Sequence, residues 1–244
     1  MTSTLKTNAI EPEGGTTNMV VGETGQNTVI GNNDIRANVL QDSGGNTLFT
    51  SDGAGTLSGV NSAFNGSTIF ISSQTISSST ASVEFTSGID TTYDEYVFYY
   101  VNIRGATNNT HFGFNGSIDS GSNYNVQKSS TYFNATHQEN GSSGEIQYNT
   151  TGNVDQGTGY QPVTTGQGSD ADECCSGYLQ LFTPADTVWA KRYMSVASGN
   201  WHVDGEENSR MEGMFNTASA INAIAWSFAS GNISSGTISL YGVL

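Results

Sequence analysis

The chain has little positive charge. Its 244 residues include 7 Lys and Arg against 22 Asp and Glu, which gives a formal net charge of −15. Binding to the phosphate backbone of nucleic acids needs clusters of Lys and Arg, because these side chains neutralise the phosphates. The sequence therefore predicts no nucleic-acid partner.

Long hydrophobic runs are also missing. A membrane-spanning helix needs about 20 consecutive apolar residues, and no segment of the chain approaches that length. The first residues, Met1 to Lys6, lack the apolar stretch of a secretory signal. We expect no membrane insertion, and a protein that is made in the cytoplasm of its producing cell and is not exported by the secretory route.

Cysteine is scarce, and the two cysteines, Cys174 and Cys175, are neighbours. A disulfide between adjacent residues is strained and closes no useful loop. The sequence therefore predicts two reduced or separately buried thiols and no disulfide framework. A vicinal disulfide or a metal contact is the alternative.

The residues that are present favour strands. Hydrophobic residues make up 35% of the chain and charged residues 12%, yet aromatic residues reach 10%, with 11 Tyr and 11 Phe. Aromatic and β-branched side chains suit strands, whereas the solvated face of a helix needs more charge than this chain supplies. The composition predicts an all-β fold.

Residues 1–66 form the first of two predicted segments. Short apolar pieces such as Met19–Val21 and Thr47–Phe49 alternate with turn signals such as Asp42–Gly45. Each piece is too small to form a core, so we predict an ordered, extended, β-rich segment that depends on copies of itself or on a larger partner. A flexible tail is the alternative.

Residues 67–244 form the second segment, with longer predicted strands. Apolar residues alternate with polar ones in 83–85, whereas Glu95–Ile103 is apolar or aromatic on both faces and predicts a central strand covered on both sides. Short connectors rich in Gly, Ser and Asn favour an antiparallel β-sandwich of jelly-roll type over a parallel sheet with helical crossovers. Further strands are predicted at 111–115, 124–126, 131–136, 177–182, 187–196, 223–228 and 236–241.

Three finer predictions concern the same segment. The stretch 139–176 is poor in strand signals and is expected to form surface loops. Met211, Met214 and Phe215 have helical spacing that supports at most one turn. Trp189 and Trp226 lie in predicted strands and are expected in the core.

The chain has no recognisable catalytic motif. His111, His137 and His202 lack the spacing of a metal cluster, and neither a nucleophile elbow nor a phosphate-binding loop occurs. Acidic residues gather near 94–95, 170–173 and 204–207, where solvated loops are the preferred interpretation, with a Ca²⁺ site or a glycosidase carboxylate pair as alternatives. We therefore expect a protein that is not an enzyme and that needs no metal and no cofactor.

Two aromatic residues lie in polar, loop-like surroundings. Trp201 is followed by His202 in Ser-Gly-Asn-Trp-His, and Tyr160 lies in Gly-Thr-Gly-Tyr-Gln. Aromatic side chains on the loops of a rigid scaffold can stack on sugar rings. Trp201, Tyr160 and His202 are therefore candidate receptor contacts, although such residues can also simply plug the ends of a sandwich.

Several segments share a low-complexity pattern, at Thr4–Thr17, Ile35–Asn46, Thr50–Gly55, Phe85–Tyr96 and Ser230–Gly242. These segments resemble tail-fibre-type structural proteins of marine tailed bacteriophages, including phages of cyanobacteria and of pelagic bacteria. The resemblance implies a virion structural protein, located in the virion, and carries over no catalytic motif.

The resemblance and the division into a thin and a compact part together predict a tail fibre or similar appendage. We expect a homotrimer, because a slender segment gains burial by trimerising and trimeric display raises avidity. The sandwich would contact a host cell-surface glycan or protein. The N-terminal segment would attach to other virion proteins through its apolar residues, with Leu5, Ile10, Val20, Val29 and Ile30 as candidates.

Two other functions fit the same features. A capsid decoration or cement protein, also called a head fibre, would use extended N-terminal arms across neighbouring capsid subunits. An enzyme that degrades surface polysaccharide would need a carboxylate pair from the acidic clusters.

Overall fold

The computed structural model describes residues 39–41, 45–51, 57–58 and 66–244, and the chain divides into two compact units, Met1–Phe64 and Asn65–Leu244. The predicted attachment residues Leu5, Ile10, Val20, Val29 and Ile30 lie outside the described residues.

The described part of the first unit is a small antiparallel sheet. It contains β1 (Val39–Gln41), β2 (Thr47–Ser51) and β3 (Leu57–Ser58), in the order β1-β2-β3. Val39 and Leu40 are exposed in this unit. Strands of two to five residues present too little apolar surface for a core of their own.

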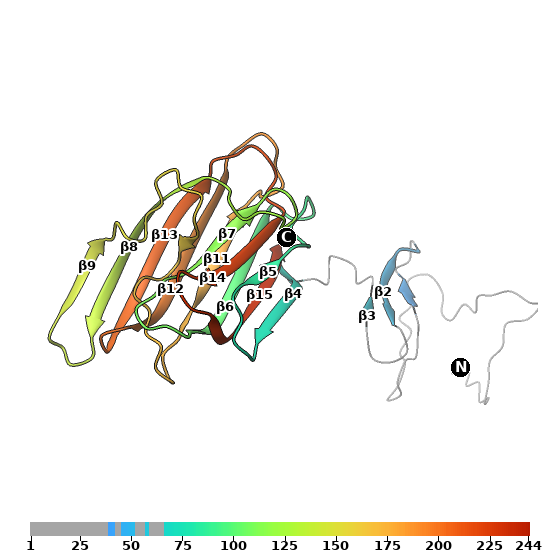
Figure 1. Cartoon of the computed structure of the whole chain (residues 1–244). Helices are drawn as coiled ribbons and strands as arrows, with labels where there is room; N and C mark the ends of the chain where they lie inside the picture. The colour runs from blue at the N-terminus through green and yellow to red at the C-terminus, as the bar shows by residue number, and fades with distance from the viewer. Residues whose placement is uncertain (1–38, 42–44, 52–56, 59–65) are drawn as a thin grey trace, which may run out of the picture. The chain divides into compact units, whose positions relative to one another are not determined.

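The second unit is all-β, and its strands pair antiparallel (Figure 1). A four-stranded sheet has the order β10-β7-β14-β5, and an eight-stranded sheet has the order β4-β15-β6-β11-β12-β13-β8-β9. No helix occurs among the described residues, and so none there could cross a membrane. The strands are β4 (Thr68–Ile76), β5 (Val83–Phe85), β6 (Glu95–Gly105), β7 (Phe112–Ser117), β8 (Lys128–Gln138), β9 (Gly144–Tyr148), β10 (Gln161–Pro162), β11 (Cys175–Phe182), β12 (Lys191–Trp201), β13 (Gly205–Phe215), β14 (Ala223–Phe228) and β15 (Ile233–Val243).

The strands form where apolar and polar residues alternate along the sequence or where the sequence is continuously apolar. Residues of β13 alternate between buried and exposed from Gly205 to Glu212, which is typical of a strand with one covered face. In β14 five of the six residues are buried, as expected for a strand between two others. The predicted strand at 223–228 has the observed bounds, the alternation around Val83 and Phe85 falls on β5, and the all-β prediction is confirmed.

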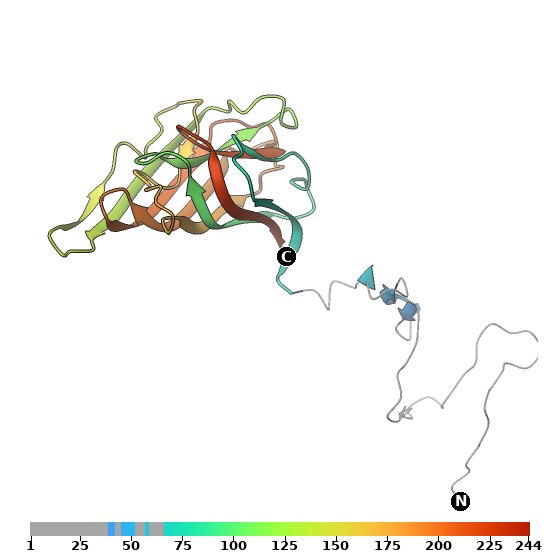
Figure 2. The same ribbon diagram turned by 60° about the horizontal axis from the view of Figure 1, so that its bottom comes forward.

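Figure 2 shows the second unit from another side, with strands in two layers. Aromatic side chains from both sheets meet at Trp226. This β14 side chain is fully buried, and its ring centroid lies 5.7 Å from that of Phe98 and 5.4 Å from that of Tyr100, both on β6 of the larger sheet. Within its own sheet it stacks on Phe112 at 5.4 Å and contacts Phe114 at 5.5 Å. Large aromatic side chains therefore join the two layers, and the prediction that Trp226 is a core residue is confirmed.

The outer face of β6 corrects one prediction. Tyr96, Phe98 and Tyr100 are buried, but Tyr99 and Val101 on the opposite face are 44% and 49% exposed. The strand is central in its sheet, between β15 and β11, yet on the outer face only Val97 is buried while Tyr99 and Val101 are exposed. The prediction that the strand at Glu95–Ile103 is covered on both faces is therefore wrong for Tyr99 and Val101.

Four smaller predictions are also wrong. Trp189 lies in the loop before β12 and is 70% exposed, because the strand starts at Lys191 instead of 187. Met211 and Met214 belong to β13 and form no helical turn. The stretch 139–176 contains β9 and β10, whereas 124–126 forms no strand. Residue types within each of these segments do not show where pairing with the neighbouring strand begins and ends, and that pairing sets the bounds of the strand.

Both cysteines are free thiols, as predicted. Cys175 is fully buried on β11, and burial raises the pKa of both thiols. A thiol whose pKa is raised has little thiolate at neutral pH and reacts slowly.

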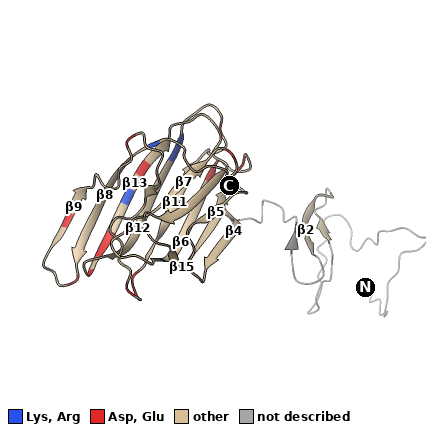
Figure 3. Cartoon of the chain, viewed as in Figure 1, with Lys and Arg blue, Asp and Glu red and all other residues tan. Residues whose placement is uncertain are grey.

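Positive charge is rare on the sheets and partly buried (Figure 3). Lys128 is fully buried at the start of β8, where its Nζ donates hydrogen bonds to the carbonyl oxygens of Val126, at 3.1 Å, and of Gly159. Burial lowers the pKa of Lys128 to about 8 from a usual value of 10.5. The folded protein therefore binds this proton less tightly than the unfolded chain.

This difference predicts a gain in stability at alkaline pH. Between about pH 8 and 10.5 the unfolded chain carries the Lys128 proton and the folded chain does not. The free energy of unfolding attributable to Lys128 therefore rises with pH, by roughly 3 kcal/mol over the whole window. Urea unfolding at several pH values should show this rise in the wild type relative to Lys128→Met. Arg192→Met, at an exposed position of β12, is the control and should follow the wild type; parallel curves for wild type and Lys128→Met would refute the assignment.

Candidate functional site

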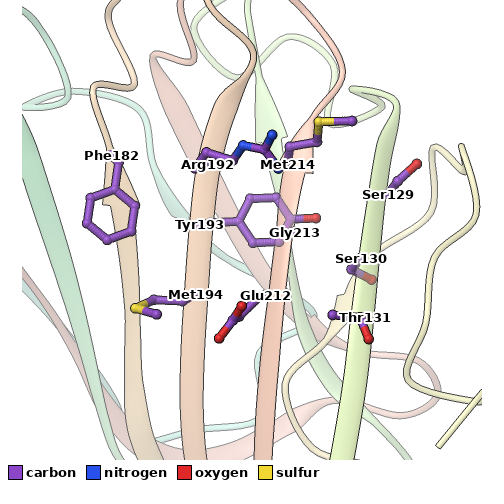
Figure 4. Close-up of a pocket in the computed structure, with 10 residues that line it drawn as sticks. All are labelled: Ser129, Ser130, Thr131, Phe182, Arg192, Tyr193, Met194, Glu212, Gly213 and Met214. Atoms are coloured by element: carbon purple, nitrogen blue, oxygen red, sulfur yellow. The ribbon is translucent and has the colours of Figure 1, made fainter. Parts of the chain in front are cut away.

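The described residues contain two hollows that are candidate sites. The larger, about 470 Å³, lies along the outer face of β11, β12, β13 and β8 (Figure 4). Its charged side chains, Arg192 and Glu212, are exposed, and Phe182, Met194 and Met214 flank a floor of strand backbone. It is a depression in a sheet surface, and its one buried polar side chain is Tyr193, whose hydroxyl has no hydrogen-bond partner and whose ring packs against Phe114 and Phe215.

The smaller hollow, about 220 Å³, is lined by polar side chains and one tryptophan. We call it the Trp201 hollow. Asn134 comes from β8, Gln147 from β9 and Trp201 from the end of β12. The loops between strands supply the other lining residues, which are Asn109, His111, Asn149, Thr151, Thr165 and Gly166.

Asn134 and Gln147 lie side by side because β8 and β9 are paired. They are register partners, so their side chains point to the same face of the sheet. This face also carries the buried Tyr132 and Thr136, which alternate with Asn134 along β8. The hollow therefore opens on the inner face of the larger sheet, near its β9 edge.

The indole of Trp201 is positioned by a glycine. Gly166 has φ of +67°, and a Cβ at this position would lie 2.8 Å from the indole Nε1 and 3.0 Å from its Cδ1. Only glycine adopts this backbone conformation without strain and leaves room for the ring. The Gly166 loop and the Trp201 ring are therefore fitted to each other.

Two histidines hold the same glycine. The Gly166 N–H donates to His111 Nδ1 at 3.0 Å, and the His202 N–H donates to the Gly166 carbonyl oxygen at 2.9 Å. His202 Nδ1 is also 3.0 Å from that oxygen. Because His111 Nδ1 accepts a hydrogen bond, this ring is neutral with its proton on Nε2, and burial lowers its pKa further. These contacts anchor one wall of the hollow.

A buried carboxylate supports the floor. Glu207 of β13 is 3% exposed and accepts hydrogen bonds from Tyr132 Oη at 3.1 Å, Asn134 Nδ2 at 2.7 Å and Thr165 Oγ1 at 2.7 Å, all at Oε1. Its Oε2 accepts one from the Thr165 N–H at 3.0 Å. Burial raises the pKa of Glu207, and the four hydrogen bonds oppose that shift. The expectation of a solvated acidic loop at 204–207 is therefore wrong for Glu207, which ties β8 and the Thr165 loop together.

The Glu207 contact fixes the orientation of the Asn134 amide. Glu207 Oε1 accepts the hydrogen bond from Asn134 Nδ2, so the carbonyl oxygen of the same amide faces the other way. That oxygen, Oδ1, is buried and has no hydrogen-bond partner, on a residue that is 2% exposed and lines the hollow. A buried carbonyl oxygen without a donor costs free energy, so a ligand that donates a hydrogen bond here is favoured.

The chemistry available in the hollow is neutral hydrogen bonding. Its lining consists of amide, hydroxyl, imidazole and indole groups, and no carboxylate or cation lines it. In the described part of the chain, no group of three His, Cys, Asp or Glu side chains is placed to hold a metal ion. The arrangement can bind a polar molecule, but it offers no pair of groups for acid–base catalysis.

The structure separates the three candidate contact residues. Trp201 lines the hollow, and His202 touches the Gly166 loop behind it. Tyr160 is not part of the lining; it is partly buried, and burial raises the pKa of its hydroxyl, whereas a hydrogen bond with Ser227 of β14 opposes that shift. Asn134, Gln147 and Thr165 were missed, because β9 was not predicted and because Thr165 reaches this position only through its hydrogen bonds to Glu207 of β13.

A scan against protein-family models, a search of curated proteins and a search of solved structures found nothing that matches this chain.

Proposed function

We propose that this protein is a structural protein of a bacteriophage virion, a tail fibre or similar appendage that contributes to binding of the host surface through its second unit. The observation that carries the proposal is the Trp201 hollow, with its neutral hydrogen-bonding lining and its buried, unpartnered Asn134 oxygen. The sequence resemblance to tail-fibre-type proteins supports the virion location. In this proposal the protein binds and performs no catalysis.

The finer fold class that we propose is a jelly-roll-like β-sandwich. The chain passes between the two sheets repeatedly, from β5 to β6 to β7 and again from β13 to β14 to β15. Such crossings between two packed antiparallel sheets are typical of jelly rolls. A rigid sandwich would present the loops of the hollow with little loss of conformational entropy on binding.

Exposed aromatic side chains on the larger sheet support self-association. Phe70, Tyr241, Tyr99 and Tyr178 lie on β4, β15, β6 and β11, and successive ring centroids are 5.5, 5.7 and 6.3 Å apart. We call this line the aromatic row. Phe70 is 58% exposed, and a continuous row of partly exposed rings is typical of a protein–protein contact. We propose that a second copy covers it in a homotrimer that is also joined through the N-terminal unit.

A charge placed in the aromatic row should weaken this association. The variant Tyr99→Asp would bury a carboxylate against apolar rings, so we expect the association constant of the full-length chain to fall about tenfold or more, measured by sedimentation equilibrium. The matched control is Thr131→Asp, at an exposed position of β8, a strand of the same sheet that carries no ring of the aromatic row. This variant should associate like the wild type. Equal association of all three proteins, or a wild type that is a monomer, would contradict the proposed contact.

Localisation on the particle tests the proposed function. Antibodies against this chain, with gold labels and electron microscopy of purified particles, should mark the tail. Labels spread over the capsid in high copy number would instead indicate the decoration or cement function, and particles without label would overturn a structural role in the virion.

A further inference from the structure

We propose that the Trp201 hollow binds a neutral saccharide, with Asn134 Oδ1 accepting a hydrogen bond from a sugar hydroxyl. The inference rests on the proposed function in surface binding, and it names the ligand class of that same site.

The first argument is the fixed Asn134 carbonyl oxygen. Its amide nitrogen donates a hydrogen bond to Glu207 Oε1 at 2.7 Å, so the side chain cannot rotate to hide the oxygen without breaking that bond. The oxygen has no donor in the protein. A ligand hydroxyl would supply one, and a fixed acceptor costs little conformational entropy on binding.

The second argument is the mixture of donors and acceptors around this oxygen. Asn109, Gln147 and Thr151 line the hollow with groups that both donate and accept. A sugar hydroxyl likewise donates one hydrogen bond and accepts others, so it can pair with any of them. A phosphate or carboxylate ligand only accepts, and it would lie against the Asn134 oxygen without a donor to offer.

The third argument concerns charge and shape. No Lys or Arg lines the hollow, and the Glu207 carboxylate lies directly behind Asn134. Acidic sugars are therefore disfavoured.

The Trp201 ring, partly exposed, provides an apolar wall for the C–H face of a sugar ring. A volume of about 220 Å³ is below the usual range for drug-sized ligands and suits a terminal sugar residue rather than a long chain segment.

The inference is tested with the full-length protein on immobilised glycans and by saturation-transfer NMR with free neutral hexoses, N-acetylhexosamines, sialic acid and glucuronic acid. We expect saturation transfer to one or more neutral sugars and none to the two acids. Gln147→Ala and Trp201→Ala should each weaken binding of that sugar by tenfold or more. Asn208→Ala, an amide at an exposed position of β13, is the matched control and should bind like the wild type.

Gln147 is partly exposed on an edge strand, so its variant keeps the test valid even if Trp201→Ala does not fold. Binding of no neutral sugar, binding that is unchanged in Gln147→Ala, or equal binding of the acidic sugars would overturn the inference.

Binding to host cells separates this inference from the proposed function. Cell binding that survives periodate oxidation of surface glycans would contradict the saccharide but keep surface binding, whereas sugar binding without any cell binding would contradict the proposed function alone.

Discussion

The variant Trp226→Ala is expected to lower the free energy of unfolding by about 3–5 kcal/mol, as found for large-to-small aromatic substitutions in cores. Trp226 is fully buried and contacts rings from both sheets, including Phe98 and Phe112. Its removal leaves a cavity where the two layers meet, and the surrounding strands cannot close it without shifting several other rings. Urea unfolding monitored by circular dichroism measures the loss.

Two variants make this prediction specific. The indole Nε1 of Trp226 is buried without a hydrogen-bond partner, so Trp226→Phe removes an unsatisfied donor while it keeps most of the ring, and we expect a loss of about 1 kcal/mol or less. Trp189→Ala removes the same side chain from a loop position that is 70% exposed, and it should change stability by about 0.5 kcal/mol at most. A Trp226→Ala variant as stable as Trp189→Ala would contradict the packing argument.

The second large effect is expected at Glu207. The variant Glu207→Ala leaves the hydroxyl of Tyr132, the amide of Asn134 and the N–H of Thr165 without their acceptor. Each buried donor that loses its partner costs about 1–3 kcal/mol, so we expect a total loss of roughly 3–5 kcal/mol. Glu206→Ala, the exposed neighbour on the same strand, is the control and should cost less than about 1 kcal/mol. Similar losses in both variants would contradict the supporting role of Glu207.

The pH dependence of the same group has a defined sign. Burial raises the pKa of the folded Glu207 carboxyl above its usual value of 4.5, so the folded chain holds this proton more tightly than the unfolded chain does. The stability that protonated Glu207 contributes is fully present below about pH 4.5 and falls as the pH rises through the folded pKa. The unfolding free energy of the wild type, minus that of Glu207→Gln, should therefore decrease from pH 4 toward neutral pH; a difference that increases would contradict the direction of the shift.

Sequence reasoning found part of the strands, missed β4, β9, β10 and β13, and placed some side chains on the wrong side. The segment 223–228 was identified with its observed bounds, because its alternation of Ile224, Trp226 and Phe228 is a local property. Tyr99 and Val101 have the same apolar character, yet they are exposed. The difference arises because the four-stranded sheet covers only one face of the larger sheet, and no local pattern encodes that coverage.

The candidate site was predictable only in part. Trp201 stood out because it is an aromatic residue among polar loop residues, and it does line the hollow. Asn134, Gln147 and Thr165 come from three separate stretches of a chain that is rich in such residues, so nothing in the sequence marks them. Glu207 was placed in a solvated loop, because an acidic residue next to Glu206 has no local sign of burial.

The amino-acid sequence by itself determined the all-β class, the period-2 strands, the free thiols and the acidic, cation-poor character of this protein. These properties follow from side-chain volume, branching and charge, which act over a few neighbouring residues. The tertiary structure alone decided which face of each strand is buried, and it brought Asn134, Thr165 and Glu207 into one hydrogen-bonded group. Such a group depends on pairing across many residues of sequence separation, where the alignment of whole strands, and not local preference, sets the distances.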